Sequence, residues 1–262
     1  QLVKTGITSQ YPQYSPDGKE VAFFEDRAAL RIVNLKSKEI RTVLDGKYVY
    51  SYSDGDIAFE WSPDSKWLLS TYIGNGGWNN QDIALVKADG KEVHNLTNSG
   101  YSDSNGKWVL DGKAMLFQSD RAGYRSHGSW GAEDDAYIMF FDLDAYNRFN
   151  MSKEEIELAD ANKDEKEKKE DEKKEEAKKK ADEKQKKTGK IEVEKVKPLE
   201  LDIENCRDRI VRLTANSSHM GDAVLSKDGD KLYYQAAFED GYDLWQHDLK
   251  DGSTKLVMKG VG

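Results

Sequence analysis

At 262 residues the chain has room for one large β domain or two small ones. Its formal net charge of −9 gives no reason to expect a nucleic-acid partner, and no apolar run is long enough to span a membrane. The single cysteine, Cys206, excludes an internal disulfide framework and a zinc site built on several thiolates.

A tight turn followed by an apolar strand recurs along the chain. In its clearest copy Ser15, Pro16, Asp17 and Gly18 fit the four positions of a type I turn, and an apolar strand follows up to Phe23. The turn aspartates, spaced by 47 residues until a long interruption precedes the last, are Asp17, Asp64, Asp111 and Asp228. A period in the forties with several short strands per unit is typical of β-propeller blades.

Each unit divides into four strands. The innermost strand precedes the turn and the second follows it, as residues 58–61 and 67–72 do in the second unit. A third strand and, after a polar hairpin, an outer strand complete the unit. The expected third strands are 30–34, 83–86, 137–141 and 244–247, and the expected outer strands include 93–97, 210–214 and 254–258. Such units cannot bury their faces alone, so we expect them to stack around an axis.

The predicted fold is all-β: a β-propeller arc of about four four-stranded blades, with a long charged helical insertion in the third blade. Residues 1–143 hold blades one to three, residues 144–209 the insertion, and residues 210–262 the outer strand of the third blade plus the fourth blade, as one partial propeller domain. Residues 2–4 look like the outer strand of an earlier blade, and residues 260–262 would lead into a further one. We therefore expect a segment of a longer propeller.

The interruption is dominated by charge. Between Lys163 and Lys187 there are 12 basic and 10 acidic residues, many of them in acid-before-base pairs at the i,i+4 spacing that favours a helix. Ser152 and Glu155 have the spacing of a capping box. Because no apolar stripe for a coiled coil is present, we expect a solitary, solvated helix that serves as a surface spacer.

Two loops that join a second strand to a third strand differ from the rest of the chain, at residues 73–80 and 120–133. In a four-stranded blade such loops share one face with the blade-to-blade connections, so adjacent blades should bring them together. Trp, Tyr and Arg are favoured at recognition hot spots, and loops on rigid scaffolds often bind. We predict that peptide binding or domain docking uses Trp78, Asn79, Asn80, Arg121, Tyr124, Arg125, His127 and Trp130. The alternative is that these rings only pack the loops against neighbouring blades.

Catalytic, metal and cofactor chemistry has little support in the sequence. His127, Ser129 and Asp134 share one loop, whereas a working triad takes its members from separate elements that preorganise them, so we expect no catalytic residue. The four histidines are scattered, and residues 160–171 match a calcium loop poorly because Glu165 stands where glycine is required. Residues 73–77 lack the strand context and the lysine of a phosphate cradle. We predict no metal and no cofactor.

With its blades laid out, the chain resembles the second propeller of tricorn-like serine proteases, especially large bacterial homologues that end in a C-terminal-processing-peptidase-type catalytic domain. The resemblance spans essentially the whole chain. The Ser-Pro-Asp-Gly-Lys turn is shared with TolB-type and dipeptidyl-peptidase propellers, whereas the long aromatic loops and the insertion are more specific. The segments that carry the resemblance are 14–23, 42–48, 72–80, 119–131, the charged insertion, 211–214 and 242–245.

The resemblance implies an exported, periplasmic enzyme with two propellers, a PDZ-like domain and a catalytic domain that supplies the nucleophilic serine and its histidine. None of those catalytic positions falls within this chain. The expected function is thus a non-catalytic propeller segment that gates or conducts peptide, or docks the catalytic core. Expected partners are peptide or unfolded protein substrate, the remaining blades, and the PDZ-like and catalytic domains, with assembly into a homo-oligomer left open. Alternatives are a TolB-type structural or protein-binding propeller without a protease, and the propeller of a dipeptidyl-peptidase-like hydrolase.

Overall fold

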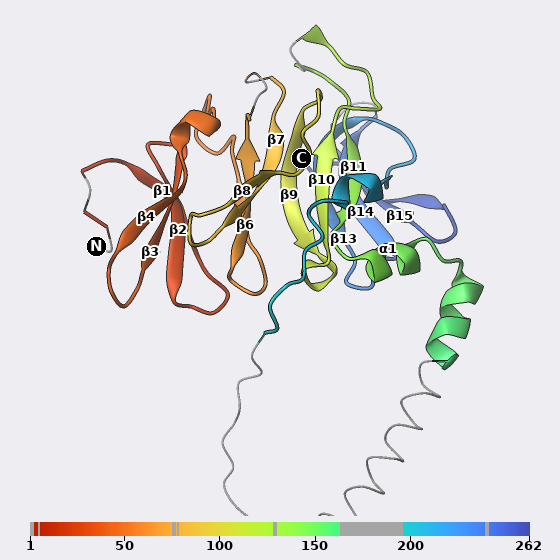
Figure 1. Ribbon diagram of the computed structural model, residues 1–262. Helices are drawn as coiled ribbons and strands as arrows, with labels where there is room; N and C mark the ends of the chain where they lie inside the picture. The colour runs from red at the N-terminus through yellow and green to blue at the C-terminus, as the bar shows by residue number, and fades with distance from the viewer. Residues whose placement is uncertain are drawn as a thin grey trace, which may run out of the picture.

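The computed structural model describes residues 3–4, 6–74, 77, 79–127, 130–162, 196–238 and 241–262. In these residues four antiparallel sheets of four strands each follow one another along the chain, and Figure 1 shows them side by side. The first sheet consists of β1 (Ser9–Tyr14), β2 (Glu20–Glu25), β3 (Ala29–Asn34) and β4 (Ile40–Leu44). The second consists of β5 (Phe59–Trp61), β6 (Trp67–Tyr72), β7 (Asp82–Lys87) and β8 (Val93–Asn95).

The other two sheets repeat this order, with one long connection inside the third. The third sheet consists of β9 (Asp103–Val109), β10 (Ala114–Ser119), β11 (Asp135–Phe140) and β12 (Ile210–Arg212). The fourth consists of β13 (His219–Leu225), β14 (Lys231–Ala237), β15 (Asp243–Asp248) and β16 (Thr254–Met258). The predicted all-β arc of four four-stranded blades is confirmed. Val3 and Lys4 lie in none of the four sheets and Leu2 lies outside the described residues, so the place of residues 2–4 in an earlier blade stays a prediction.

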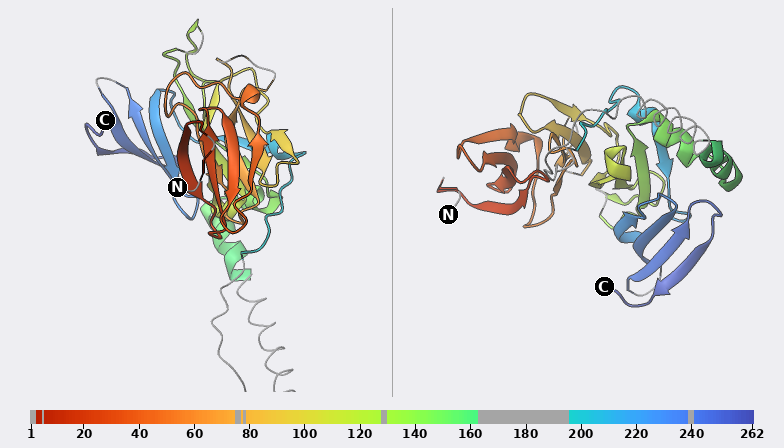
Figure 2. Two further views of the ribbon diagram at one scale, coloured as in Figure 1. Left: turned by 90° about the vertical axis from the view of Figure 1, so that its left-hand side faces the viewer. Right: turned by 90° about the horizontal axis from the view of Figure 1, so that it is seen from below.

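The blades stack through apolar side chains because each sheet alternates its residues between two faces. Phe24 of the first blade meets Phe59 of the second edge to face, with ring centroids 5.1 Å apart, in one buried cluster. A second cluster joins blades two and three, and a third joins blades three and four. Seen from below in Figure 2, the four blades form an open arc with the two ends of the chain at its two limits.

The repeated turn is held by its serine hydroxyl. Ser15 Oγ donates to Asp17 at 2.8 Å and accepts from the backbone N–H of Glu20 at 3.0 Å, so one side chain ties the turn to the strand that follows. Ser62 and Ser226 make the same pair of contacts in the second and fourth blades. The third blade has no serine at this position and departs from the pattern. Its turn is a short 3-10 segment, Leu110–Gly112, in which all three residues have positive φ.

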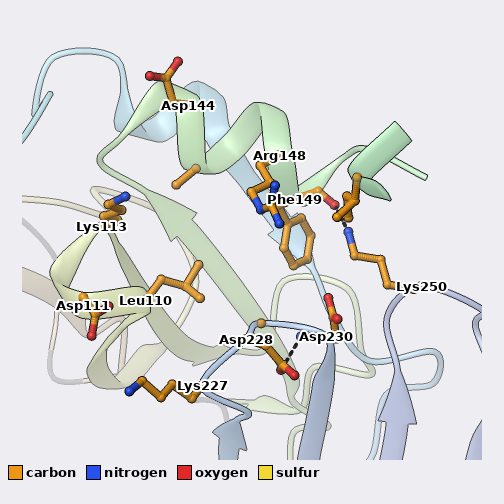
Figure 3. A pocket seen from close by; sticks show the side chains of 13 residues that line it. Leu110, Asp111, Lys113, Asp144, Arg148, Phe149, Lys227, Asp228, Asp230 and Lys250 are labelled. Atoms are coloured by element: carbon orange, nitrogen blue, oxygen red, sulfur yellow. Dashed lines mark hydrogen bonds between the residues drawn. The ribbon is translucent and has the colours of Figure 1, made fainter. Parts of the chain in front are cut away.

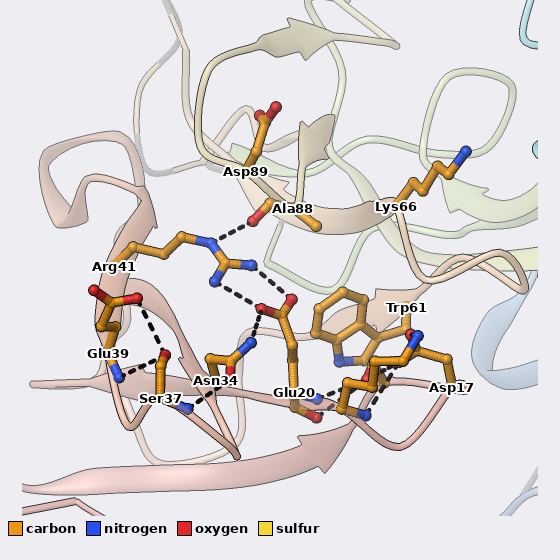
Figure 4. A network of polar contacts seen from close by, with 12 residues as sticks. Asp17, Glu20, Asn34, Ser37, Glu39, Arg41, Trp61, Lys66, Ala88 and Asp89 are labelled. Atoms are coloured by element: carbon orange, nitrogen blue, oxygen red, sulfur yellow. Dashed lines mark hydrogen bonds and ion pairs between the residues drawn. The ribbon is translucent and has the colours of Figure 1, made fainter.

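Polar contacts also cross the junction between the first two blades (Figure 4). The guanidinium of Arg41 donates to both carboxylate oxygens of Glu20, at 2.8 and 2.6 Å, within the first blade. Its Nε donates to the backbone oxygen of Ala88 in the second blade at 2.7 Å. One arginine therefore fixes the outer edges of two blades against each other.

The insertion begins with two helices, of which α1 (Leu143–Phe149) packs against the third blade and the second extends away from the blades (Figure 1). Helix α1 starts at Asp142, whose side chain accepts from the N–H of Ala145 at 2.6 Å, and residues 153–162 form the second helix. The predicted capping box is confirmed: Ser152 N–H donates to the Glu155 carboxylate at 2.8 Å, and Glu155 N–H donates to Ser152 Oγ at 3.2 Å. The charged run from Lys163 to Lys187 lies outside the described residues.

The returning part of the insertion packs across two blades. Leu199 N–H donates to the turn carboxylate of Asp64 at 2.8 Å, and Arg207 donates to the backbone oxygen of Leu96 at 2.9 Å, both in the second blade. A 3-10 turn, Cys206–Arg209, then leads into β12 of the third blade, with Cys206 and Arg209 buried. From Leu199 to Arg209 the returning segment is therefore packed against the propeller, whereas residues 196–198 are exposed.

Candidate functional site

The two predicted recognition loops join β6 to β7 and β10 to β11. The β10–β11 loop, residues 120–134, projects at the top of Figure 1, while α1 and the helix after it leave from the opposite side. We call the side that carries the β6–β7 and β10–β11 loops the loop face.

Arg125 joins the β10–β11 loop to its surroundings. Its guanidinium pairs with the buried carboxylate of Asp120 at 3.1 Å, and it donates to Gly100 O at 2.9 Å and to the Asn80 side-chain oxygen at 2.6 Å. The guanidinium carbon also lies 5.4 Å from the centre of the Tyr101 ring. Because Asn80 belongs to the β6–β7 loop, Arg125 ties the recognition loops of two blades together.

Arg121 lies deeper, at the base of the same loop. It donates to Ser119 Oγ at 2.9 Å and to the Asp103 carboxylate at 2.7 Å. Its guanidinium is centred 5.3 Å from the Phe117 ring and 5.0 Å from the Tyr137 ring, and its side chain is only 19% exposed. Arg121 therefore supports the loop from below, which leaves little of its surface for a ligand.

The aromatic residues of this loop face solvent. Tyr124 is 66% exposed and Trp130 is 72% exposed, and His127 of the same loop is also exposed. The loop backbone that presents them is tight, since Glu133 N–H donates to Tyr124 O at 2.8 Å and a Cβ on Gly123 would lie 2.2 Å from Glu133 O. Asn79 is half-buried, and Trp78 and Ser129 lie outside the described residues.

Buried aspartates below the loop were missed by sequence reasoning. Asp103, Asp120 and Asp135 are at most 1% exposed, and each pairs with an arginine, at 2.7 Å to Arg121, 3.1 Å to Arg125 and 2.8 Å to Arg212. Such pairs compensate for the cost of burying each carboxylate.

Part of this aspartate pattern repeats with the blades. Asp135, the first residue of β11, accepts from Thr214 Oγ1 at 2.5 Å, as Asp82, the first residue of β7, accepts from Thr97 Oγ1 at 2.9 Å. In both blades a threonine just after the outer strand is thereby latched to the third strand. Aligning Asp82 with Asp135 and Thr97 with Thr214 was the sequence signal that could have found this latch.

Asp134 differs from these three aspartates. It is partly buried, and burial together with the nearby carboxylates of Asp120 and Asp135 raises its pKa to about 6, an effect that His219 partly offsets. No ion pair of its side chain occurs among the described residues.

A pocket of about 370 Å³ lies on the other side of the arc, at the root of the insertion (Figure 3). Phe149 and Arg148 reach it from α1, Asp228 and Asp230 from the turn of the fourth blade, and Lys250 from the next hairpin. Its strongest charges are already engaged: Arg148 pairs with Asp160 at 2.8 Å, and Lys250 Nζ donates to Phe149 O at 2.7 Å. Burial lowers the pKa of Lys250, which is consistent with a structural tie between α1 and the fourth blade.

Within the described ranges, no group of three or more His, Cys, Asp or Glu side chains has the geometry to hold a metal ion. In the same part of the chain no helix is both long and apolar enough to cross a bilayer. On the loop face, exposed rings lie on a loop whose base carries buried ion pairs.

Neither a protein-family model nor a curated sequence matches the chain. Among solved structures, the chain is similar to TolB from Acinetobacter baumannii, with 19% sequence identity and a TM-score of 0.51 over 98% of this chain and 45% of that one. It is also similar to the tricorn protease, with 11% identity and a TM-score of 0.61 over 96% of this chain and 22% of that one. At such identities the likeness defines the fold alone. The chain is a β-propeller segment, and it spans less than half of the length of either of these proteins.

Proposed function

We propose that this chain is a non-catalytic propeller segment of a tricorn-like serine protease, and that its loop face holds extended peptide or unfolded protein for the catalytic domain. The observation that carries the proposal is the pair of exposed rings, Tyr124 and Trp130, on a loop anchored to two blades by Arg125. A rigid aromatic loop loses little conformational entropy on binding, and its rings can stack on apolar side chains of any sequence. The enzyme class rests on the sequence resemblance to tricorn-like proteases, and the fold, which the tricorn protease shares, agrees with it. The periplasmic location belongs to the same proposal.

Arg121 and Arg125 belong to the predicted binding set, and we assign them the role of positioning the loop. Arg121 and Arg125 are engaged inside the chain, so they position the loop, and the rings make the contact. On the loop face, exposed aromatic rings thus lie above arginine–aspartate ion pairs.

The proposal is tested with a reduced, alkylated and therefore permanently unfolded protein as the ligand. Binding is compared between the wild-type chain and a Tyr124→Ser/Trp130→Ser variant. Because aromatic anchors dominate such interfaces, we expect the affinity to fall by about tenfold or more. The matched control is Tyr14→Ser/Tyr52→Ser, which removes two rings that are 69% and 78% exposed outside the two recognition loops.

An equal loss in both double variants contradicts a specific site, because it would mean that any exposed ring binds unfolded chain. If the unfolded protein binds all three proteins equally while the loop variant no longer associates with a catalytic domain supplied separately, the loop docks that domain instead. In that case the peptide-holding role is abandoned.

A further inference from the structure

One carboxylate on the loop face lacks the counter-ion that its neighbours have. Asp103, Asp120 and Asp135 each pair with an arginine, whereas Asp134 has no ion pair and no side-chain hydrogen bond among the described residues. A partly buried carboxylate in this state is costly, because it gives up hydration without a compensating charge.

A buried hydroxyl beside Asp134 is also unsatisfied. Asp134 N–H donates to Ser218 O at 2.8 Å and Ser218 N–H donates to Asp134 O at 3.2 Å, which makes the two residues a directly opposed antiparallel pair. Side chains of such a pair lie on the same side of the ladder. Ser218 is 3% exposed, and its Oγ has no hydrogen-bond partner in the described part of the chain. Buried hydroxyls in this state are rare and call for a missing partner.

The surroundings favour a positive partner of compact shape. The charged groups that act on Asp134 are Asp120 and Asp135, each held by its arginine, and His219, which is exposed at the start of β13. At neutral pH the site thus offers one carboxylate and one hydroxyl oxygen without a positive counter-charge. A primary ammonium group carries three N–H donors on one atom and can donate to more than one oxygen, whereas a guanidinium is wide and planar.

We propose that Asp134 and Ser218 form a subsite for a primary ammonium group of the bound peptide, either a lysine side chain or a free amino terminus. The inference rests on the proposed function, because the backbone of Tyr124 is hydrogen-bonded to Glu133, the residue that precedes Asp134 in the same loop. In this arrangement Tyr124 and Trp130 contact the apolar part of the peptide. The Asp134–Ser218 subsite favours peptides that place an ammonium group next to it.

The test uses three heptapeptides that share one apolar sequence and an amidated carboxyl end. The first is acetylated with norleucine at its centre, the second is acetylated with lysine there, and the third has norleucine and a free amino terminus. We expect at least one ammonium-bearing peptide to bind the wild-type chain about tenfold tighter than the neutral peptide, as charge-assisted hydrogen bonds typically provide. The lysine peptide and the free-terminus peptide separate the two sources of the ammonium group.

Two variants locate the effect. Asp134→Asn removes the charge at nearly constant shape, and Ser218→Ala removes the buried hydroxyl; both should reduce the preference for the ammonium peptides and leave the neutral peptide unaffected. The control is Asp144→Asn, an exposed carboxylate on α1, which should change nothing. The preference should also grow as the pH rises through about 6 in the wild type, and persist in His219→Gln, which excludes histidine deprotonation as the cause.

Equal binding of all three peptides by the wild type overturns the subsite while the proposed function stands, and assigns the two oxygens to water. A preference that survives Asp134→Asn overturns it as well. Absence of binding by every peptide, the neutral one included, overturns the proposed function and this inference with it.

Discussion

At the scale of single residues, the turn serine does more than fit a turn. Ser62 is fully buried, and its hydroxyl both donates to Asp64 at 2.7 Å and accepts from Trp67 N–H at 2.9 Å. The Ser62 hydroxyl thereby satisfies the Trp67 N–H, which lies at the start of β6 and has no partner in the β-ladder. The same contacts in the first and fourth blades explain why Ser and Asp recur together.

Ser62→Ala should therefore lower the free energy of unfolding by about 1–2 kcal/mol, the cost of leaving buried polar groups without their partner. Urea denaturation followed by tryptophan fluorescence measures the loss. Ser9→Ala, at an exposed position at the start of β1, serves as the control and should leave the stability unchanged. Equal stabilities of Ser62→Ala and wild type would show that the turn holds without its hydroxyl.

The raised pKa of Asp134 gives a stability effect whose sign depends on pH. Its carboxyl binds a proton more tightly in the folded chain, at a pKa of about 6, than in the unfolded chain, near 3.8. The resulting stabilisation is complete below the unfolded pKa and is lost as the pH rises through about 6. Asp134→Asn should therefore stabilise the fold on the order of 2 kcal/mol at about pH 8 and have little effect at about pH 4.

Denaturation curves across that pH range measure the free energy of unfolding of Asp134→Asn. A variant of the neighbouring carboxylate, Asp135→Asn, is the comparison. Asp135→Asn breaks the contacts of a fully buried carboxylate with Arg212 and Thr214, and should destabilise the fold by about 3 kcal/mol at neutral pH. If Asp134→Asn instead lowers the stability at high pH, its carboxylate is satisfied in the native chain and the basis of the ammonium subsite is lost.

At the scale of elements, the base of the β10–β11 loop is anchored by the inward contacts of Arg121 and Arg125. Arg125 spans from Asp120 in its own loop to Asn80 in the loop of the preceding blade. On this anchored loop Tyr124 is 66% exposed and Trp130 is 72% exposed. Removing the anchor should loosen the loop without unfolding the blade.

Arg125→Gln should speed amide exchange within residues 121–127 and at Glu133 roughly tenfold, with a global stability close to that of the wild type. Hydrogen-exchange mass spectrometry resolves the two effects. Arg27→Gln, which removes an exposed ion pair with Asp54 in the first blade, should leave this loop as it is. Unchanged exchange in Arg125→Gln would mean that the backbone pairing of Tyr124 with Glu133 suffices to hold the loop.

The sequence was sufficient for the strands and insufficient for the roles of the loop residues. Strands such as β6 and β16 could be predicted to the residue, because turn chemistry and apolar patterning are local signals. The partners of Arg121 and Arg125 could not, since Asp103 and Asn80 come from other strands and loops and no local pattern pairs them. The packing of Leu199 against the Asp64 turn joins residues 135 apart in the chain, which no periodicity reveals.

At the scale of the whole molecule, the insertion belongs to the third blade and also contacts the second and fourth blades. Lys250 of the fourth blade holds the end of α1 by donating to Phe149 O and Met151 O, while Leu199 and Arg207 tie the returning segment to the second blade. These contacts all involve residues on either side of the charged run and none within it.

Replacing residues 163–195 by a Gly/Ser linker of the same length should thus leave the propeller folded, with Tm within about 2 °C of the wild type. Lys250→Met, by contrast, leaves the backbone oxygens of Phe149 and Met151 without this donor and should cost about 1–2 kcal/mol. A linker variant that fails to fold would show that the charged run itself supports the blades.

The central claim, that the loop face holds unfolded chain, is tested most directly by a photo-crosslinking amino acid placed at Tyr124. Irradiation with a permanently unfolded protein should give a crosslinked product from this position, and little product from the same amino acid at Tyr52, which is even more exposed at 78%. Equal product from both positions, or product from Tyr52 alone, would contradict the claim.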